Sequence, residues 1–535
     1  MIEKDAIARG WHATPWATAQ HLTRDLAPEA QWKPARHLRV LSRLLQGAAR
    51  GGVRLCVSMP PRHGKSLLTS VWFPVWFLSH YPSRKVVMAT HSHEFSQHWG
   101  SEVRALLREH GEILCGVKLR EDSQAKGWWL TEQGGGMLSV GRGSSVTGRG
   151  AHLLVIDDIL DGMEEGLSPT ILERCWDWYQ GTARTRLEPG ASIVVLMTRW
   201  NEGDLIGRLK RQQDEAERAG KPPRKPWTFV DLPAVAEEKP GPLDWREPGA
   251  PLWAERWPLE DLGEIRADVG SYVWAAEFQC RPAPAEGNIL KRHYLRWWHR
   301  DEDGIFVLGD RRVRLEDLIV FMSVDLAGSK RTTADLTCAQ VWGVVPKWDT
   351  PRLLLDQALL RLEAPDHLRL IAALHERWRC LQIGVESEHF GMAVVQAAKR
   401  QGVPTEDGRR RVILPIVELE ADRSKLARFL PAAADAEQGR VWLPANAEWT
   451  EALVTNLTRF AGEGSVAHDD DIDAFSHART MAEKVTHGMY DGEWAKELQA
   501  GPASDPLRSI FDPAYGDPDQ DDEGALAPRL WARGT

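Results

Sequence analysis

The chain is 535 residues long, and a chain of this length usually forms more than one hydrophobic core. With 43% hydrophobic and 27% charged residues it has the composition of a globular protein, and its 25 tryptophans name no function. The net charge of -9 argues against a protein that coats nucleic acid through its overall field, so any contact with nucleic acid must be local. The six cysteines show no CxxC pair or zinc spacing, which favours a reduced cytosolic protein without structural zinc.

The amino-terminal residues, MIEKDAIARG, lack the apolar segment of a secretory signal. No window approaches the roughly 18 apolar residues that a membrane span requires. The most apolar stretch, VWFPVWFL at residues 71–78, is short and contains a proline, so it is interpreted as a buried helix. We therefore expect a cytoplasmic protein without membrane association.

Short apolar runs alternate with amphipathic stretches from about residue 54 to residue 200, which predicts a parallel sheet with helices on both faces. A stretch rich in Pro and Gly follows, and a second alternating region begins at LIVFMSVDLAG. The last residues, which include GDPDQDDEGALAP, are acidic and are expected to be flexible. The predicted parts are a first α/β domain (1–208), a connector or lid (209–317), a second α/β domain (318–484) and an acidic tail (485–535).

A phosphate loop, MPPRHGKS, lies between a predicted strand and a predicted helix. In such a loop backbone amides bind phosphates, Lys65 reaches the terminal phosphates and Ser66 ligates Mg²⁺. Met59 stands where the usual motif has its first glycine, so an ordinary loop after a strand is the alternative interpretation. The candidate ATP-binding residues of the loop are Arg62, His63, Gly64, Lys65 and Ser66.

Two further predicted strands end in polar residues that suit ATP hydrolysis. HLLVIDDIL would bring Asp157 to the Mg²⁺ and Asp158 to the attacking water, unless it is only a buried strand with an acidic turn. SIVVLMTRW ends in Thr198, whose hydroxyl can sense the terminal phosphate.

Arginines near these strands are candidates for a finger inserted into a neighbouring subunit's ATP site. Arg142 and Arg149 lie in the glycine-rich segment LSVGRGSSVTGRG, and Arg62 lies in the phosphate loop. We favour Arg149, although each arginine taken alone is more typical of a solvated loop.

These motifs resemble the ATPase motor of phage terminase large subunits. PPRHGKS, GSSVTGRGAHLLVIDD and LMTRWNEGDLIGRL look like that family's phosphate loop, Walker B region and coupling motif, in the same order. The segment QWKPARHLRVLSRLLQGAARG is similar to the family's segment near the adenine, so the resemblance implies Trp32 and His37 as further ATP contacts. LWAERWPLEDL and YVWAAEFQCRPAPAEGNIL look like its connector into a nuclease.

A second group of acids follows the connector. Each lies at a strand end or a helix start: Asp325 closes LIVFMSVDLAG with Asp335 after it, Glu386 ends a strand in LQIGVESEHFG, and Asp469, Asp470 and Asp473 open a helix in HDDDIDAFSHA. Spacing of three or four residues puts Asp469 or Asp470 on the same helix face as Asp473. Converging carboxylates repel unless divalent cations neutralise them, which predicts Mg²⁺ or Mn²⁺ and two-metal phosphodiester cleavage. The alternative is a helix start whose acids the helix dipole favours.

The acids also look like the terminase nuclease pattern of an Asp, a Glu and a DDxxDA helix start. Of the first two aspartates of DDDID we choose Asp470 as the catalytic ligand, with Asp469 and Asp473 as further metal ligands. ADRSKLARFLPAAADAEQGRVWLP resembles the family's stretch beside this centre, which implies that Lys425 and Arg428 contact the DNA backbone.

The resemblance, from about residue 32 to residue 484, implies an α/β protein with an N-terminal RecA/ASCE-like P-loop ATPase domain and a C-terminal RNase H-like nuclease domain. The implied cofactors are ATP and Mg²⁺, with Mn²⁺ as a substitute in the nuclease site. The implied function is translocation of double-stranded DNA into a procapsid and cutting of concatemeric DNA at the start and end of packaging. The implied partners are double-stranded DNA, a portal protein, the small terminase subunit and further copies in a ring, a pentamer. The implied location is the host cell cytoplasm, with transient docking on the procapsid.

Two alternatives stay open. A helicase or restriction-type translocase with an appended nuclease would separate strands without a capsid, but the sequence holds no additional helicase motif. A non-catalytic assembly protein with decayed sites would have no reason to keep GKS, the paired aspartates and the three-part acidic group.

Overall fold

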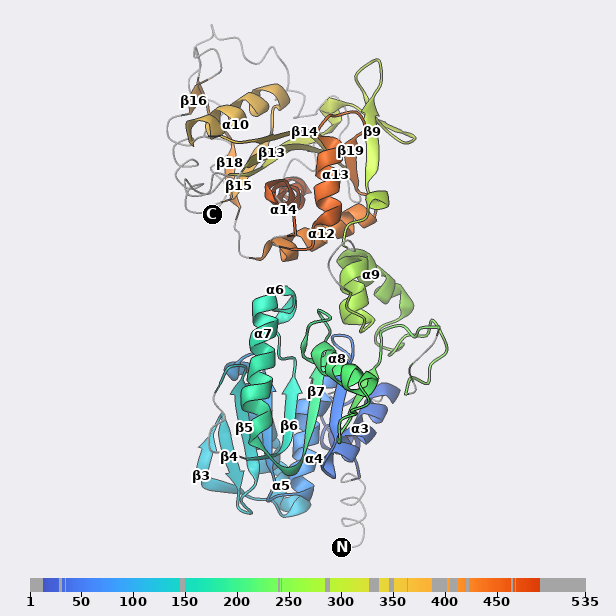
Figure 1. Cartoon of the computed structure of the whole chain (residues 1–535), viewed down its shortest axis with the longest axis vertical. Helices are drawn as coiled ribbons and strands as arrows, with labels where there is room; N and C mark the ends of the chain where they lie inside the picture. The colour runs from blue at the N-terminus through green and yellow to red at the C-terminus, as the bar shows by residue number, and fades with distance from the viewer. Residues whose placement is uncertain are drawn as a thin grey trace. The chain divides into compact units, whose positions relative to one another are not determined.

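The computed structural model describes residues 13–27, 31–33, 35–144, 150–238, 241, 243–283, 289–326, 336–345, 351–362, 364–386, 402–404, 411–419, 423–462, 465–466 and 468–490. The chain divides into two compact units, Met1–Ile289 (unit 1) and Leu290–Thr535 (unit 2), whose elements are labelled in Figure 1. Across the described residues, no helix has the length and apolar character to cross a membrane.

Unit 1 is built on an eight-stranded sheet. Its strands are, from one edge to the other, β3 (Leu119–Ala125), β4 (Trp128–Thr131), β5 (Gly136–Gly141), β2 (Lys85–Thr90), β6 (Ala151–Asp157), β7 (Leu187–Met197), β1 (Arg54–Ser58) and β8 (Trp227–Asp231). All neighbours from β5 to β8 are parallel, whereas β3 and β4 pair antiparallel at one edge. The parallel sheet predicted from the apolar runs is therefore confirmed, and the antiparallel edge is an addition to it.

Helices cover both faces of this sheet. The helices of unit 1 are α2 (Pro15–Leu22), α3 (Arg36–Ala49), the π-helical η1 (Leu67–Trp72), α4 (Phe73–His80), α5 (His93–Cys115), α6 (Gly162–Leu167), α7 (Pro169–Trp178), η2 (Tyr179–Ala183), η3 (Arg184–Arg186), α8 (Leu205–Arg218), α9 (Leu259–Val273) and η4 (Trp274–Phe278), of which α9 and η4 pack in a separate small cluster. The apolar stretch of residues 71–78 forms the end of η1 and most of α4, and all of it is buried, as predicted.

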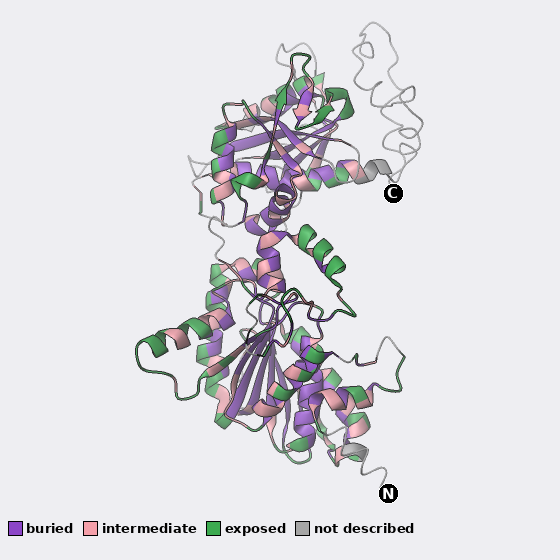
Figure 2. Cartoon of the chain, turned by 90° about the vertical axis from the view of Figure 1, so that its right-hand side faces the viewer, coloured by how far each residue is buried: buried purple, intermediate pink, exposed green. Residues whose placement is uncertain are grey.

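Alternate residues of each strand enter different cores, because successive side chains of a strand point to opposite faces. Val155 of β6 packs in one core with α3, α4 and α5, whereas Ile156 packs in another with α7 and α8. Figure 2 shows the central strands as buried throughout. A sheet covered on both faces leaves only its strand ends accessible to a ligand.

The stretch 209–317 differs from the connector expected from its prolines and glycines. Within it, β8 pairs with β1 in the sheet of unit 1, and β9 (Arg296–Arg300) pairs with β19 (Val441–Pro444) in unit 2. Proline-rich loops connect these strands, so the composition of the whole stretch does not reveal them. The boundary between the units falls at residues 289 and 290.

Unit 2 is built on a nine-stranded mixed sheet. Its order is β11 (Arg311–Val313), β10 (Phe306–Leu308), β9, β19, β14 (Arg352–Leu360), β13 (Thr337–Val344), β12 (Ile319–Asp325), β15 (Gln382–Glu386) and β18 (Ile416–Leu419). β12, β13 and β14 are antiparallel, while β15 and β18 continue the sheet in parallel from β12. This pairing of an antiparallel meander with two parallel strands agrees with the expected RNase H-like fold.

The remaining elements of unit 2 are η5 (Arg292–Tyr294), η6 (Leu315–Asp317), α10 (Ala364–Trp378), β16 (Val403–Pro404), β17 (Arg411–Val412), α12 (Lys425–Glu437), α13 (Thr450–Arg459) and α14 (Asp470–Tyr490). Ile371 and Trp378 of α10 pack in the core on one face of the sheet. On the other face the ring of Trp342 in β13 lies 5.8 Å from that of Phe475 in α14. The sheet and α14 together position the acidic residues of this unit.

Candidate functional site

The phosphate loop of unit 1 connects β1 to a helix that starts at Lys65. Gly64 has a φ of +77°, and a Cβ at this position would meet the Leu38 side chain at 3.3 Å, so glycine suits it on both counts. Arg62 is exposed at the tip of the loop with a φ of +60°. Met59, at the position of the missing first glycine, is fully buried. The loop thus forms a tight turn although its motif is irregular.

The predicted polar residues of three strands meet at one edge of the sheet. β7 lies between β1 and β6, so the carboxyl ends of all three strands adjoin. Lys65 Nζ donates a 2.8 Å hydrogen bond to Thr198 Oγ1 and lies 3.3 Å from Asp158 Oδ2. Ser66 Oγ donates to Asp157 Oδ1 at 3.1 Å. These residues, far apart in the sequence, form one connected polar cluster.

Asp157 is fully buried at the end of β6. Burial, together with the charge of Asp158, raises its pKa to about 7, although hydrogen bonds from Ser70 and Ser66 oppose the shift. A buried carboxylate beside a second carboxylate and a serine hydroxyl is an oxygen donor set that suits a hard divalent cation. Ser66 and Asp157 therefore fit Mg²⁺.

Asp158 adopts a left-handed conformation, with a φ of +43°, directly after β6. The backbone amide of Thr198 donates a 2.8 Å hydrogen bond to its Oδ1, while Lys65 approaches its Oδ2. The left-handed backbone turns the Asp158 carboxylate toward the phosphate loop, whereas the Asp157 side chain is fully buried.

The candidate arginine fingers differ in their surroundings. Both guanidinium nitrogens of Arg142 bond to the Glu165 carboxylate, at 2.7 and 2.5 Å. Hydrogen bonding to Glu165 also raises the pKa of Arg142. This ion pair holds the Arg142 side chain against Glu165 of the same chain, which disfavours Arg142 as an arginine finger in the ATP site of a neighbouring subunit. Arg149 lies outside the described residues.

Trp32 and His37, which the resemblance implied as ATP contacts, lie in the core beside the phosphate loop. His37 is fully buried, and its Nε2 lies 2.9 Å from the backbone oxygen of His63, so it supports the phosphate loop from behind. Trp32 is 9% exposed and packs edge-on against Trp72 in the core. Both side chains thus pack behind the phosphate loop in this structure, and their contact with a nucleotide stays a prediction. His63 is also buried, with its Nδ1 2.8 Å from the backbone oxygen of Pro61.

Glu277 is a residue near the ATP site that the sequence did not indicate. It lies in η4, and the amide of Ala234, in the loop after β8, donates a 2.7 Å hydrogen bond to the Phe278 carbonyl at the end of η4. Burial raises the pKa of Glu277 to about 7; the charge of Lys65 opposes the shift and that of Asp158 adds to it. No motif marks this glutamate, because it reaches the site only through the packing of η4.

In unit 2 the predicted acids also converge. Asp325 ends β12 and Glu386 ends the parallel neighbour β15, whereas Asp470 and Asp473 lie in the first turn of α14. Burial raises the pKa of Asp325 well above its usual value, and the charges of Asp473, Glu386 and Asp470 raise it further. Burial likewise raises the pKa of Asp470. Carboxylates that oppose each other's ionisation in this way must lie close together.

Lys425 and Arg428, at the start of α12, neutralise part of this acidic cluster. Lys425 Nζ lies 2.8 Å from Asp469 Oδ1 and 2.7 Å from Asp473 Oδ2. Arg428 lies 3.0 Å from Glu386 Oε2 and 2.8 Å from Asp473 Oδ1. The two cations predicted beside the centre therefore contact the acids directly, and Asp473 bonds to both.

His477 is a further member of the cluster that the sequence analysis missed. Its Nε2 lies 2.8 Å from Glu386 Oε2 and 2.6 Å from an Arg428 nitrogen. Burial would raise the pKa of Glu386, but the bond from His477 and the charge of Arg428 outweigh it and bring the pKa to about 2. The signal was available, because His477 follows Asp473 by four residues and so shares its helix face.

Asp471, in the same acidic run, has a structural environment. It is buried, its Oδ2 accepts a 3.0 Å hydrogen bond from Asn456, and its backbone oxygen accepts one from Gln340. Asp335 lies outside the described residues.

The acids of unit 2 offer carboxylate oxygens, the ligands that Mg²⁺ and Mn²⁺ prefer. Within the described residues, no three His, Cys, Asp or Glu side chains are spaced to hold a metal ion together. Lys425 and Arg428 hold three of these acids in ion pairs. The donor chemistry therefore fits a divalent cation that would compete with these two cations.

Comparison with known proteins identifies the family. The family model described as "Terminase large subunit, T4likevirus-type, N-terminal" matches residues 56–296, and the model described as "Terminase RNaseH-like domain" matches residues 322–482. Together the two models cover most of the chain, in the order in which the two sites occur. The chain belongs to the terminase large subunit family. Terminase large subunits are the ATPase-nucleases of viral DNA packaging, and this terminase has that function.

Solved structures similar to this terminase include the large terminase of a thermophilic bacteriophage, with 10% identity, coverage of 84% of this chain and 100% of that chain, and a TM-score of 0.43. The large terminase of bacteriophage HK97 has 10% identity, coverage of 84% and 95%, and a TM-score of 0.30. The human cytomegalovirus terminase nuclease domain has 15% identity, coverage of 32% and 84%, and a TM-score of 0.22. Scores this low do not establish a shared fold, so the family assignment depends on the two family models. No curated protein matches this terminase significantly.

Proposed function

We propose that unit 1 hydrolyses ATP at the carboxyl edge of its sheet with the residues of the polar cluster. Residues 62–66 bind the phosphates through backbone amides, and Lys65 contacts the terminal phosphates. Mg²⁺, held by Ser66 and Asp157, supplies charge neutralisation when it is bound. The observation that carries this proposal is the direct contact of Lys65 with Thr198 and of Ser66 with Asp157 across three strands.

Asp158 orients the attacking water in this proposal. Its carboxylate is held by Lys65 and the Thr198 amide, and phosphates that attract Lys65 would release Asp158 Oδ2 for that water. Thr198, which bonds to Lys65, would then report the state of the nucleotide to β7. Arg149 of an adjacent subunit would stabilise the charge that develops on the transferred phosphoryl group.

We propose that unit 2 cuts DNA with Asp325, Glu386 and Asp470 as catalytic carboxylates and with Asp469 and Asp473 beside them. Two Mg²⁺ ions, or Mn²⁺ ions in their place, would activate water and neutralise the leaving oxygen when bound. Metal binding would free Lys425 and Arg428 from their ion pairs with the acids. Both cations are then available for backbone phosphates at the cleavage point, in agreement with their expected role on DNA.

The biological setting follows from the family. We propose that the terminase forms a homo-oligomeric ring, a pentamer, on a portal protein and drives double-stranded DNA into the procapsid. The small terminase subunit would select the packaging site, and unit 2 would cut concatemeric DNA at the start and the end. The host cell cytoplasm, with transient docking on the procapsid, is the proposed location.

One experiment tests both site assignments. Purified terminase is incubated with plasmid DNA and Mg²⁺ or Mn²⁺, and cleavage and ATP turnover are measured for wild type, Lys65→Ala and Asp325→Ala. Loss of the phosphate contact should lower the ATP turnover of Lys65→Ala by at least about a hundredfold, as losses of a single charge-stabilising group do. Asp325→Ala should lose cleavage and keep its ATP turnover.

Surface variants of the same residue types serve as matched controls. Lys118→Ala and Asp303→Ala remove an exposed lysine of unit 1 and an exposed aspartate of unit 2, and both should behave as wild type. Normal ATP hydrolysis by Lys65→Ala, or normal cleavage by Asp325→Ala, would show that the corresponding site is assigned incorrectly.

A further inference from the structure

A polar cavity, called here the cation-lined cavity, lies at the amino-terminal ends of β1 and β8 in unit 1. The ATP site, in contrast, lies at the carboxyl ends of the strands. The cation-lined cavity has a volume of about 480 Å³, and Arg54 and Trp227, paired in register at the starts of β1 and β8, contribute to its wall. The phosphate loop follows the other end of β1, five residues further along. At about 3.3 Å per residue, the strand separates the two sites by roughly 15 Å. This cavity is therefore distinct from the nucleotide site.

The cavity carries an unbalanced positive charge. Arg54, Arg184, Arg224 and Lys225 line it, and no aspartate or glutamate is among its described lining residues. Arg54 donates a 3.0 Å hydrogen bond to the Ala191 carbonyl, which leaves its charge uncompensated. The other three cations have no ion pair within the described part of the chain. A concave group of cations without acids attracts an anion and holds it at several points.

Two aromatic side chains stand among these cations. Tyr179 is buried and Trp227 is partly exposed. The side chain of Gln213 in α8 holds the Trp227 backbone, because its Oε1 accepts from the Trp227 amide at 2.6 Å and its Nε2 donates to the Trp227 carbonyl at 3.4 Å. Strand β8 and helix α8 thus form part of the wall, and the loop between them carries Arg224 and Lys225.

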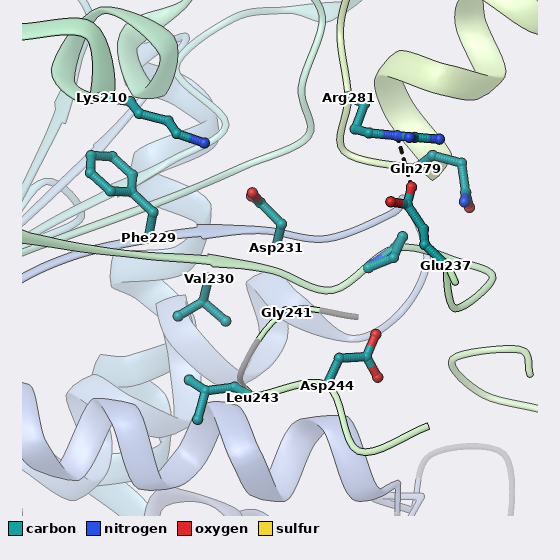
Figure 3. Close-up of a pocket in the computed structure, with 11 residues that line it drawn as sticks. Lys210, Phe229, Val230, Asp231, Glu237, Gly241, Leu243, Asp244, Gln279 and Arg281 are labelled. Carbon is teal, nitrogen blue, oxygen red and sulfur yellow. Dashed lines mark ion pairs between the residues drawn. The ribbon is translucent and has the colours of Figure 1, made fainter. Parts of the chain in front are cut away.

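A different cavity of unit 1 serves as a comparison, because charged residues of both signs line it. It measures about 320 Å³ and lies beside β8 (Figure 3). Its Arg281 lies 2.7 Å from Glu237, and its Asp244 is paired with Arg246 at 2.6 Å. Acids and cations thus occur together in the cavity of Figure 3, and several of them are paired. The cation-lined cavity has no such internal compensation.

We propose that the cation-lined cavity binds phosphates of the DNA backbone while the motor translocates DNA, an inference that rests on the proposed packaging function. Each strand of a duplex presents a phosphate about every 3.4 Å along its axis, so a cluster of four cations can neutralise consecutive phosphates. Contacts to phosphates carry no sequence information, which suits a motor that must move along any sequence. A free polyphosphate has the same chemistry, and the experiment distinguishes the two.

The test is duplex binding by a triple variant, Arg184→Ala with Arg224→Ala and Lys225→Ala. Binding of a labelled duplex is followed by fluorescence anisotropy over a range of salt concentrations, without divalent cations so that the DNA stays intact. The affinity should fall at least about tenfold, and the slope of log affinity against log salt should shrink by about 2.7, at about 0.9 for each lost contact. ATP turnover without DNA should stay within about twofold of wild type, since the cavity lies away from the ATP site.

A matched control removes as many cations from the same region. Arg211, Arg218 and Lys221 are exposed and do not line the cavity, so the triple alanine variant of these residues should lose far less affinity. The single variant Arg224→Glu covers the case in which the triple variant does not fold, and it too should weaken duplex binding.

Calorimetry with inorganic tripolyphosphate in saturating ADP identifies the ligand. If the triple variant loses tripolyphosphate binding but still binds the duplex as wild type does, the assignment to DNA is overturned. A triple variant that binds both the duplex and tripolyphosphate as tightly as the control variant does would overturn the site itself. Neither result touches the packaging function, which Lys65→Ala tests separately through ATP turnover.

Discussion

The ATP site of unit 1 and the acidic cluster of unit 2 differ in how cations balance the negative charge of their carboxylates. In unit 1 two adjacent aspartates end one strand, and in the described part of that unit Asp158 forms its ion pair with Lys65 alone. In unit 2 the acids come from two strands and a helix, and Lys425 and Arg428 form four ion pairs with them.

The difference indicates how each site would respond to its ligand. In the ATP site of unit 1, Lys65 is paired with Asp158 beside a second carboxylate, Asp157, so a bound polyphosphate would need further positive charge, which we propose comes from Mg²⁺ and from Arg149 of another subunit. Unit 2 already contains two cations, so a metal ion must replace them at the acids. We therefore expect the ATP site to depend on a neighbour and the nuclease cluster to be complete within one chain.

The largest expected effect tests this dependence. Arg149→Ala should lower ATP turnover by about a thousandfold, the lower end of what arginine fingers contribute, whereas Arg142→Ala should change it less than about threefold because Arg142 is paired with Glu165. Mixing Arg149→Ala with Lys65→Ala should restore part of the activity, since one mixed interface contains an intact site. No recovery on mixing would contradict a finger that acts between subunits.

A second, smaller effect tests the in-chain balance of unit 2. Asp473→Asn keeps the shape of the side chain but removes the charge that Lys425 and Arg428 share, so cleavage should fall about a hundredfold. Asp471→Asn is the matched control in the same acidic run and should retain cleavage within about threefold, because Asp471 bonds to Asn456. Plasmid cleavage measures both variants, and equal losses would argue that α14 merely needs its acids for folding.

The smallest expected effect concerns pH and unit 1. Burial raises the pKa of Glu277 to about 7, above the ordinary value of 4.5, so the folded protein binds the proton more tightly than the unfolded chain. The stability that this group contributes is full below pH 4.5 and is lost as the pH rises through 7. Glu277→Gln should remove this loss, so its unfolding free energy relative to wild type should rise by about 2 kcal/mol between pH 5 and pH 8.

Urea unfolding at the two pH values measures this difference. Glu264→Gln, at an exposed position of α9, is the matched control and should show no such change. A constant difference between Glu277→Gln and wild type at both pH values would contradict a raised pKa for the partly buried Glu277.

Most of the fold and the two groups of site residues were predictable because their signals are local. A buried parallel strand is an apolar run that ends in polar residues, and such runs marked β1, β6, β7, β12 and β15, of which β6, β12 and β15 end in an acid. The phosphate loop was recognisable because Lys65 and Ser66 must follow a tight glycine turn. Composition, in contrast, concealed β8 and β9 within a proline-rich stretch.

The sequence by itself determined which residues are the candidates for the chemistry, since Lys65, Asp157, Asp325 and Glu386 lie in patterns that each require only a strand and its end. Only the tertiary structure decided how those residues are paired. The bond of His477 to Glu386, the burial of His37 behind the phosphate loop and the approach of Glu277 to the ATP site all join segments distant in the sequence. Such contacts depend on how helices pack against a sheet, and no periodicity along the chain records that packing.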